Sequence, residues 1–440
     1  MPLQSLVLQA LQQRRDRLAQ QHPGPVMLWS GRAVSRNFPA NVYPFRANSH
    51  FLYFAGLSLA NAAIHLEGGQ LTLFMDDPTP EAALWHGPAP SREAIAAEIG
   101  ANAAYPYGHA ERYRQAAATL PAQNSIERDR SLALVEALVA LRLHHDTAAL
   151  EQIKAAAAVS VLAHQAGMAA TPKAKTEAQV RAAMEQVIMA HDMTCAYNSI
   201  VTVHGEVLHN EQYHHTLAPN DLLLADVGAE APSGWASDIT RTWPVSGRFT
   251  PAQREIYTVV LAAHDACIAA AKPGIEYRDL HLLACRTLAQ GLVELGLLQG
   301  QPDSLVERDV HALFFPHGVG HLLGLDVHDM EDLGDVAGYA PGRQRSDRFG
   351  LKFLRLDRPL AANMVVTIEP GFYQVPGILA PARQSGLYDD AVNWERLEAF
   401  REVRGIRIED DVQITATGCT VLTAALPTQV EAIETLASAA

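Results

Sequence analysis

Four acidic residues lie in or at the end of apolar, strand-like segments, where an unpaired carboxylate is costly. They are Asp226 in LLLAD, Asp238 in WASDIT, Glu369 in VVTIE and Glu409 in GIRIEDD. A buried carboxylate is usually stabilised by an arginine or lysine, by a helix terminus or by a metal ion. Taken singly, each acid is more simply explained as a salt-bridged or surface-facing residue. Taken together they carry four negative charges, which two divalent cations would neutralise.

A glycine-rich segment, PHGVGHLLGLDVHD at 316–329, supplies the histidines His317, His321 and His328. Its interleaved glycines argue against a helix, so we expect an extended or looping segment in which one histidine ligates a metal. A hydrogen-bonded polar role is the alternative for any one of them. A site rich in oxygen donors, with imidazole and without sulfur, suits Mn²⁺, Co²⁺, Zn²⁺ or Fe²⁺. Two such ions about 3.5–4 Å apart could share a water and lower its pKa for attack on a carbonyl.

Strand periodicity brings these acids together. Pro232 in APSG predicts a turn midway between Asp226 and Asp238, so a hairpin would place the two aspartates side by side. The expected strand at 235–243 has one face formed by Ala236, Asp238, Thr240 and Thr242. In the expected strand at 404–415, Arg407 and Glu409 share a face opposite a row of isoleucine and valine residues.

The chain divides into two expected domains. Residues 1–145 mix strand patterns at 26–31, 62–69 and 71–76 with helical patterns at 91–100 and 110–120, which indicates an α/β domain. From Asp146 to residue 440, long Ala-rich helices alternate with strand signals, which predicts an α+β domain with a mainly antiparallel sheet. VLAHQAGMAATP (161–172) resembles VLAAHDACIAAAKP (260–273), and this echo suggests a domain of two related halves, with chance similarity as the alternative.

Composition excludes several classes of protein. Acids outnumber bases, 48 to 34, which disfavours nucleic acid as a partner. The four cysteines form no CxxC pair, so neither a zinc knot nor a redox pair is indicated, and buried reduced thiols are expected. No apolar run is long enough to span a bilayer, and the N-terminus lacks the pattern of a signal peptide, so we expect a cytoplasmic protein without membrane contact.

The segments LLLADVGAE, SDITRTWPVSGRFT, PHGVGHLLGLDVHD, TIEPGFY and GIRIEDDV together resemble the pita-bread metallopeptidases that cleave Xaa-Pro bonds, namely prolidase (Xaa-Pro dipeptidase) and aminopeptidase P. YPFRANSHFLYFAGL (43–57) resembles the N-terminal domain of the same proteins. The resemblance implies a pita-bread catalytic domain with two divalent metal ions, Mn²⁺ first and Co²⁺ or Zn²⁺ as alternatives. The implied ligands are Asp226, Asp238, His321, Glu369 and Glu409, of which Asp238 and Glu409 would bridge the metals.

The resemblance also implies roles around the metals. His209 and His328 match histidines that act near the scissile bond, Glu369 is a catalytic residue as well as a ligand, and His317 would line the substrate pocket. Arg407, expected like His317 and Arg355 to contribute to substrate binding, matches an arginine beside the site that could orient a metal carboxylate. The chain departs from the family in two places. Asp226 and Asp238 are one residue further apart than usual, and His204-Gly205 replaces part of the familiar Gly-Ser-Gly-Glu-Asn pattern.

The sequence is compatible with two activities on Xaa-Pro bonds, that of a dipeptidase and that of an aminopeptidase. RFGLKFLRLDRPL (348–360) resembles the prolidase stretch whose arginine, here Arg355, would bind the free carboxylate of a dipeptide, so a dipeptidase is the first expectation. An aminopeptidase P acting on longer peptides is the alternative. Remoter alternatives are a metal-free creatinase-like enzyme or a non-enzymatic binding module, which the retention of all five ligand positions disfavours. Trp85 resembles a tryptophan that a partner chain supplies in some relatives, so a homodimer or higher homo-oligomer is expected.

Overall fold

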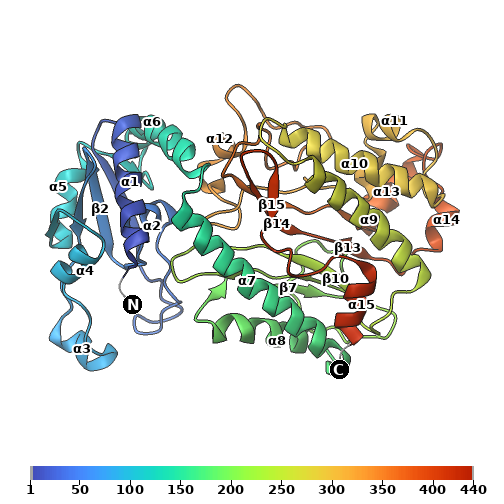
Figure 1. Cartoon of the computed structure of the whole chain (residues 1–440), viewed down its shortest axis with the longest axis horizontal. Coiled ribbons are helices and arrows are strands. Elements are labelled where there is room, and N and C mark those ends of the chain that lie inside the picture. Colours follow the sequence, from blue (N-terminus) through green and yellow to red (C-terminus); the bar gives the residue numbers. More distant parts are fainter. Residues whose placement is uncertain (1–2, 439–440) are drawn as a thin grey trace. The chain divides into compact units, whose positions relative to one another are not determined.

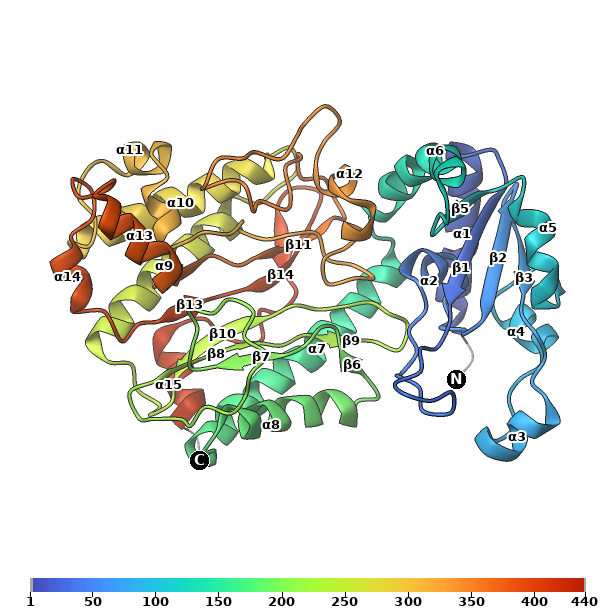
Figure 2. The same ribbon diagram turned by 180° about the vertical axis from the view of Figure 1, so that it is seen from behind.

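The computed structural model describes residues 3–438, which form two compact units. The first contains the chain up to Gln152 together with Pro232–Trp235, and the second contains the rest of the described chain. Figure 1 and Figure 2 draw the ribbon from opposite sides. Within the described residues, no helix combines the length and the apolar character needed to cross a membrane.

The first unit is built on a five-stranded sheet with the strand order β4-β3-β2-β1-β5. Its strands are β1 (Val26–Gly31), β2 (Ala62–Glu67), β3 (Gln70–Phe74), β4 (Ala103–Tyr105) and β5 (Ala118–Leu120). β2 pairs antiparallel with β1 and β3, whereas the outer pairs β1–β5 and β3–β4 are parallel. The expected α/β fold and its first three strands are confirmed.

Six helices accompany this sheet. They are α1 (Ser5–Gln21), α2 (Ser49–Ala55), α3 (Pro80–His86), α4 (Arg92–Glu98), α5 (Ala110–Arg114) and α6 (Ser125–Arg142). The helix expected at 110–120 is wrong in its second half, because the chain leaves the helix after Arg114 and enters β5. There Ala118 lies opposite Val26 of β1, and the buried Ala117 packs with Met27 in the core. Completing the sheet therefore outweighs the helical propensity of this Ala-rich segment.

The second unit contains two pairs of long helices. They are α7 (Thr147–Ala170) with α8 (Glu177–Ala190), and α9 (Pro251–Ala270) with α10 (Tyr277–Glu294). The carboxylate of Asp146 accepts a hydrogen bond from the N–H of Ala149 at 2.9 Å and so caps α7, and Thr250 caps α9. These helices lie in front of the strands in Figure 1 and behind them in Figure 2, so they cover one face of the sheets.

The strands of the second unit form small antiparallel sheets, which confirms the expected α+β architecture. They are β6 (Thr194–Cys195), β7 (Ile200–Thr202), β8 (Leu222–Asp226), β9 (Ala229–Glu230), β10 (Thr240–Pro244), β11 (Val365–Ile368), β12 (Gly371–Tyr373), β13 (Gly405–Arg407), β14 (Asp410–Ile414) and β15 (Cys419–Val421). The remaining helices of the described chain are short: η1 (Tyr107–His109) in the first unit, and η2 (Thr171–Lys173), α11 (Pro302–Glu307), η3 (Val310–Leu313), η4 (Glu331–Leu333), α12 (Asp335–Gly338), α13 (Pro376–Ser385), α14 (Trp394–Glu398) and α15 (Val430–Ser438) in the second.

Two expected strands differ from the structure. The strand expected at 235–243 begins only at Thr240, and the one expected at 404–415 is interrupted at Ile408 and Glu409. The interruption has a structural cause, since the chain changes partners there: β13 pairs with β12, and β14 pairs with β11. In between, the N–H of Glu409 donates to the carbonyl of Thr240 at 3.0 Å. This break places Glu409 beside the end of β8 and the start of β10.

Candidate metal centre

All ten residues singled out from the sequence line one pocket of about 490 Å³ in the second unit. The five expected ligands are Asp226, Asp238, His321, Glu369 and Glu409; the other five are His209, His317, His328, Arg355 and Arg407. They come from the ends of β8, β11 and β13, the residues just before β10, the loop before β8, the glycine-rich segment and, for Arg355, the connection between α12 and β11. The sequence therefore identified one contiguous site, whose individual roles remain proposals.

The two aspartates face the pocket from neighbouring strands. In the β8–β10 pair Thr240 lies opposite Asp226, so Asp238, two residues before Thr240, shares its face. Despite the extra residue between them, both aspartates line the pocket and neither side chain is turned away. The hydroxyl of Tyr197 lies 2.5 Å from Oδ1 of Asp226 and 2.5 Å from Oδ1 of Asp238, bridging the pair.

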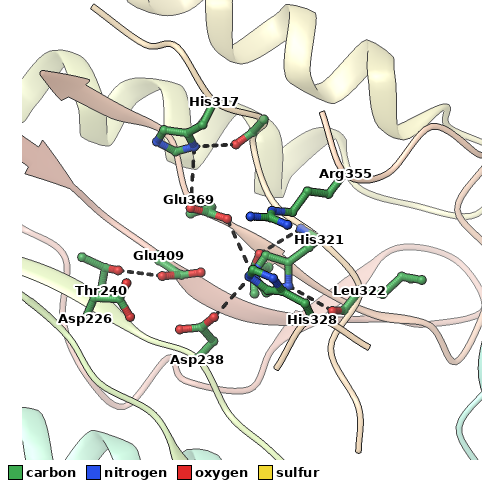
Figure 3. Close-up of polar contacts among 12 residues, drawn as sticks. Asp226, Asp238, Thr240, His317, His321, Leu322, His328, Arg355, Glu369 and Glu409 are labelled. Atoms are coloured by element: carbon green, nitrogen blue, oxygen red, sulfur yellow. Dashed lines mark hydrogen bonds and ion pairs between the residues drawn. The ribbon is translucent and has the colours of Figure 1, made fainter. Parts of the chain in front are cut away.

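His321 stands between the carboxylates (Figure 3). Its Nε2 lies 3.4 Å from Oδ2 of Asp238 and 3.6 Å from Oε1 of Glu369, while Nδ1 lies 3.0 Å from the carbonyl of Leu322. A proton on Nδ1 donated to that carbonyl leaves the Nε2 lone pair directed at the acids, which is the orientation of a metal-ligating histidine.

The glycine-rich backbone makes this placement possible. Gly320 has a φ of +154°, and a Cβ there would lie 2.3 Å from the carbonyl oxygen of Thr367. Only glycine fits such a close approach. It brings the N–H of His321 within 3.1 Å of Thr367 Oγ1. The segment 316–329 contains no helix, as its glycines predicted.

The electrostatics of the acids indicate a site for cations. Burial and the neighbouring charge of Asp226 raise the pKa of Asp238 to about 8, and burial raises the pKa of Glu369 to about 7. Burial, with the charges of Asp238 and Glu369, also raises the pKa of Glu409. Four carboxylates with one imidazole form an oxygen-rich donor set for two divalent ions, whose charge would remove the mutual repulsion.

The other histidines lie at the margin of these acids. His328 Nδ1 lies 3.2 Å from Oε2 of Glu331, and its ring centroid lies 4.1 Å from that of His321. His209 is exposed in the loop between β7 and β8. His317 Nε2 lies 2.9 Å from the hydroxyl of Tyr373. Nδ1 of His317 also lies 2.8 Å from the carbonyl oxygen of Gly318, so both of its ring nitrogens face protein partners. The substrate contacts expected for His209, His317 and His328 stay predictions.

The two arginines of the pocket differ in burial and in their hydrogen-bond partners. Arg407 is almost fully buried and uses every guanidinium nitrogen within the protein, donating to Asp226, Thr240 and Tyr373, with 2.6 Å to Asp226 Oδ2. This geometry favours orientation of a ligand carboxylate over substrate contact. Arg355 is partly exposed at the pocket, and its Nη1 lies 2.7 and 2.8 Å from the two oxygens of Glu331.

Three supporting residues were not found from the sequence. Tyr197 contacts the aspartate pair. Tyr373 contacts His317 and Arg407. Glu331 contacts His328 and Arg355. Tyr197 and Tyr373 carry no local pattern that marks them. Glu331 had one available signal, because it follows His328 by three residues, a spacing that suits a hydrogen bond in a turn. Thr240, which donates to Glu409 Oε2 at 2.6 Å, was visible on the face of Asp238.

Comparisons with known proteins agree with this fold and site. The model of metallopeptidase family M24 matches residues 151–416, and that of the aminopeptidase P N-terminal domain matches residues 11–125. The "Probable Xaa-Pro aminopeptidase PEPP" of Fusarium vanettenii is 33% identical over 414 residues, covering 88% of this chain and 86% of the relative. The "Probable Xaa-Pro aminopeptidase pepP" of Penicillium rubens is 33% identical, covering 90% and 89%.

Solved structures give the same result. Aminopeptidase P from E. coli with the inhibitor Pro-Leu has a TM-score of 0.83 and 27% identity, covering 100% of this chain and 99% of that one. Pseudomonas aeruginosa aminopeptidase PepP has a TM-score of 0.80 and 28% identity, covering 98% of both chains. Fold and pocket together define a metal-dependent hydrolase. The chain belongs to metallopeptidase family M24 and carries an aminopeptidase P N-terminal domain.

The expected peptidase class, its pita-bread fold and its requirement for divalent metal ions are thus confirmed. The expected first activity, that of a dipeptidase, is not confirmed. The relatives named above are aminopeptidases, and they favour the alternative that the sequence left open.

Metal binding is expected to weaken as the pH falls, because the ligand carboxyls must lose their protons. In the metal-free protein their raised pKa values mean that the folded state holds more protons than the unfolded state between pH ~4 and about 8. Stability of the metal-free protein should therefore fall as the pH rises through that window, while affinity for Mn²⁺ should rise. Calorimetric titration in buffers of different ionisation enthalpy would measure the released protons. Affinity independent of pH, with no proton release, would contradict this account.

Proposed function

We propose that this protein is an Xaa-Pro aminopeptidase of the aminopeptidase P type, which removes the residue that precedes proline at the N-terminus of a peptide. The names of its relatives and of its solved neighbours support this activity, as does the match to the aminopeptidase P N-terminal domain. A pocket of about 490 Å³ has the size usual for sites that hold small organic ligands.

The observation that carries the choice between the two activities is the ion pair of Arg355. A dipeptidase needs a cation for the free carboxylate of the substrate proline. Here both oxygens of Glu331 already face Arg355, and the contacts with His328 and Arg355 lower the pKa of Glu331 to about 2. Glu331 pairs with Nη1 of Arg355, so a dipeptide carboxylate at this arginine would meet the negative charge of Glu331, whereas the backbone of a longer peptide brings no competing charge to this position.

Two divalent ions, which we propose to be Mn²⁺, would be held by Asp226, Asp238, His321, Glu369 and Glu409. When bound, they would supply Lewis acidity and an activated water. Arg407 and Tyr197 hold the carboxylates in place, and Thr240 fixes Glu409. His209 and His328 stand at the pocket margin, where they can bind and protonate a peptide near the scissile bond.

Two further expectations stay proposals. A homo-oligomer is supported by Leu84 and Trp85 of α3, which are 77% and 75% exposed, since large apolar side chains in such positions often mark protein contacts. A cytoplasmic location rests on the sequence pattern alone.

Substrate length tests the proposed activity directly. The purified protein loaded with Mn²⁺ is expected to cleave Gly-Pro-Ala with a kcat/KM at least as high as for Gly-Pro, because Glu331 opposes only the free carboxylate of the dipeptide. The release of glycine from each peptide is the measurement. Strong preference for Gly-Pro would overturn the aminopeptidase proposal in favour of the dipeptidase.

Because Arg355 lies in the pocket, a dipeptidase is the second candidate function. The role of Arg355 can be tested separately. A charge-assisted hydrogen bond is worth ~1.5–3 kcal/mol. If Arg355 anchors a substrate carboxylate, Arg355→Ala lowers kcat/KM on dipeptides by roughly ten- to a hundred-fold. The loss on a dipeptide amide would be far smaller. On the aminopeptidase proposal we expect similar, small losses on acid and amide, with Arg345→Ala, a second pocket arginine, as the matched control.

A further inference from the structure

A second group of potential metal ligands lies outside the pocket. His281 and Cys285 stand one helical turn apart on α10, and His311 belongs to η3. The three side chains are 0%, 0% and 2% exposed, and one donor atom from each lies within 4.8 Å of the others. None of them lines the pocket of the catalytic acids.

The orientation of His281 is that of a ligand. Its Nε2 lies 2.9 Å from the carbonyl oxygen of Gly350, so this nitrogen carries the proton and donates it there. Nδ1 is then the nitrogen with the lone pair; it lies 3.9 Å from Sγ of Cys285, which is 3.5 Å from Nε2, so the thiol would turn toward Nδ1 if both bound one ion. A backbone carbonyl that receives the second ring N–H is the usual support of a metal-bound histidine.

The buried ring of His311 is not satisfied by hydrogen bonds from the described residues. Within the described part of the chain, neither of its ring nitrogens has a hydrogen-bond partner of good geometry, although the carbonyl of Leu305 lies close enough to act on its pKa. Leaving a buried polar group unsatisfied is costly. The backbone of Gly350 packs against the ring, since a Cβ there would lie 2.9 Å from His311 Nε2. An ion bound by His311 would offset the cost.

Burial keeps both imidazoles in the neutral form that binds metal. It lowers the pKa of His281 to about 4 and that of His311 to about 3. Burial raises the pKa of Cys285, so the metal-free group is a thiol and releases its proton to solvent when an ion binds. Asp309, which is paired with Arg348 at 2.9 Å, places a carboxylate near the group.

We propose that His281, Cys285 and His311 form a structural site for one Zn²⁺ ion, separate from the catalytic pair. Donor atoms of a tetrahedral His₂Cys zinc site lie roughly 3.3–3.7 Å apart, so the three donors, which lie within 4.8 Å of one another, would draw together when the ion binds. The ion would fasten η3 to α10. The ring of Phe315 lies 5.7 Å from that of His281 and 4.8 Å from that of His317, so the bound ion would stiffen one wall of the pocket.

Cobalt provides a test that is independent of substrate and of catalysis. The pocket residues contain no sulfur ligand, so a thiolate-to-cobalt charge-transfer band in the Co²⁺-loaded full-length enzyme would report this second site alone. We expect the wild type to show the band and to hold a third equivalent of tightly bound metal. Cys285→Ser should lose both the band and the third equivalent while keeping two equivalents. Cys267→Ser, a neighbouring buried cysteine on α9, should match the wild type.

The measurement on the wild type tests the proposed zinc site even if the Cys285→Ser variant does not fold. A Co²⁺-loaded wild type with two equivalents of metal and no charge-transfer band overturns the site. A band that persists in Cys285→Ser overturns it equally, because another thiolate would then be the ligand. Loss of the band in Cys267→Ser with its retention in Cys285→Ser would also exclude it.

Discussion

Replacement of Asp238 by asparagine is expected to remove the metal pair and to lower kcat/KM by at least about a thousandfold. The carboxylate lies 3.4 Å from His321 and shares Tyr197 with Asp226, so it occupies the centre of the donor set. An amide offers one neutral oxygen in place of a charged bridge between two cations. Lewis-acid stabilisation is worth several kcal/mol, at ~1.4 kcal/mol per factor of ten in rate.

Thermal unfolding separates loss of metal from loss of fold. Burial and Asp226 make the charge of Asp238 unfavourable in the metal-free protein, as its raised pKa shows. Metal-free Asp238→Asn should therefore unfold at a temperature no lower than the metal-free wild type. Added Mn²⁺ should raise the melting temperature of the wild type and leave that of the variant unchanged.

Asp411 supplies the matched control for this experiment. It is buried beside Asp238, accepts hydrogen bonds from the Ser237 hydroxyl and the Asp238 N–H, and does not line the pocket. Burial raises its pKa, and its replacement removes no carboxylate from the pocket, so Asp411→Asn should keep its metal. Two full equivalents of tightly bound metal in Asp238→Asn would instead show that the residue is not a ligand.

The parts of the site that sequence could predict are those set by local periodicity. Strand β1 runs from Val26 to Gly31, the same residues that its pattern marks, because a short apolar run closed by glycine leaves few alternatives. The acids were recognised because carboxylates are rare inside such runs. The shared face of Asp238 and Thr240 followed from the two-residue repeat of a strand, even though regular pairing begins only at Thr240.

The parts that sequence could not predict depend on partners distant in the chain. The alternation through 404–415 continues without a break, yet the strand is interrupted because the backbone at Glu409 bonds to Thr240, 169 residues away. Tyr197 reaches the aspartates from a short loop with no marking pattern. The absence of CxxC pairs, on which the expectation of no zinc knot rested, says nothing about the group of His281, Cys285 and His311. His281 and Cys285 share a helix face at i and i+4, but His311 joins them only through the fold.

The second large effect is expected for the two histidines of the pocket margin. His328→Ala and His209→Ala should each lower kcat by roughly a hundred- to ten-thousand-fold, the usual range for loss of a general acid or base. The Nδ1 of His328 faces Glu331 at 3.2 Å, which leaves Nε2 for the substrate. Metal content should stay at the wild-type level in both variants.

A structural role would give a different set of results. His214→Ala is the matched control for His209, since His214 is an exposed histidine of the same loop that does not line the pocket, and it should behave as the wild type. Added imidazole should restore part of the activity of the two alanine variants, because the pocket is open to a ring of that size and proton transfer is all that is missing. Loss of one metal equivalent in His328→Ala would make His328 a ligand in place of His321, its neighbour at 4.1 Å. Unchanged kcat would reduce both histidines to packing residues.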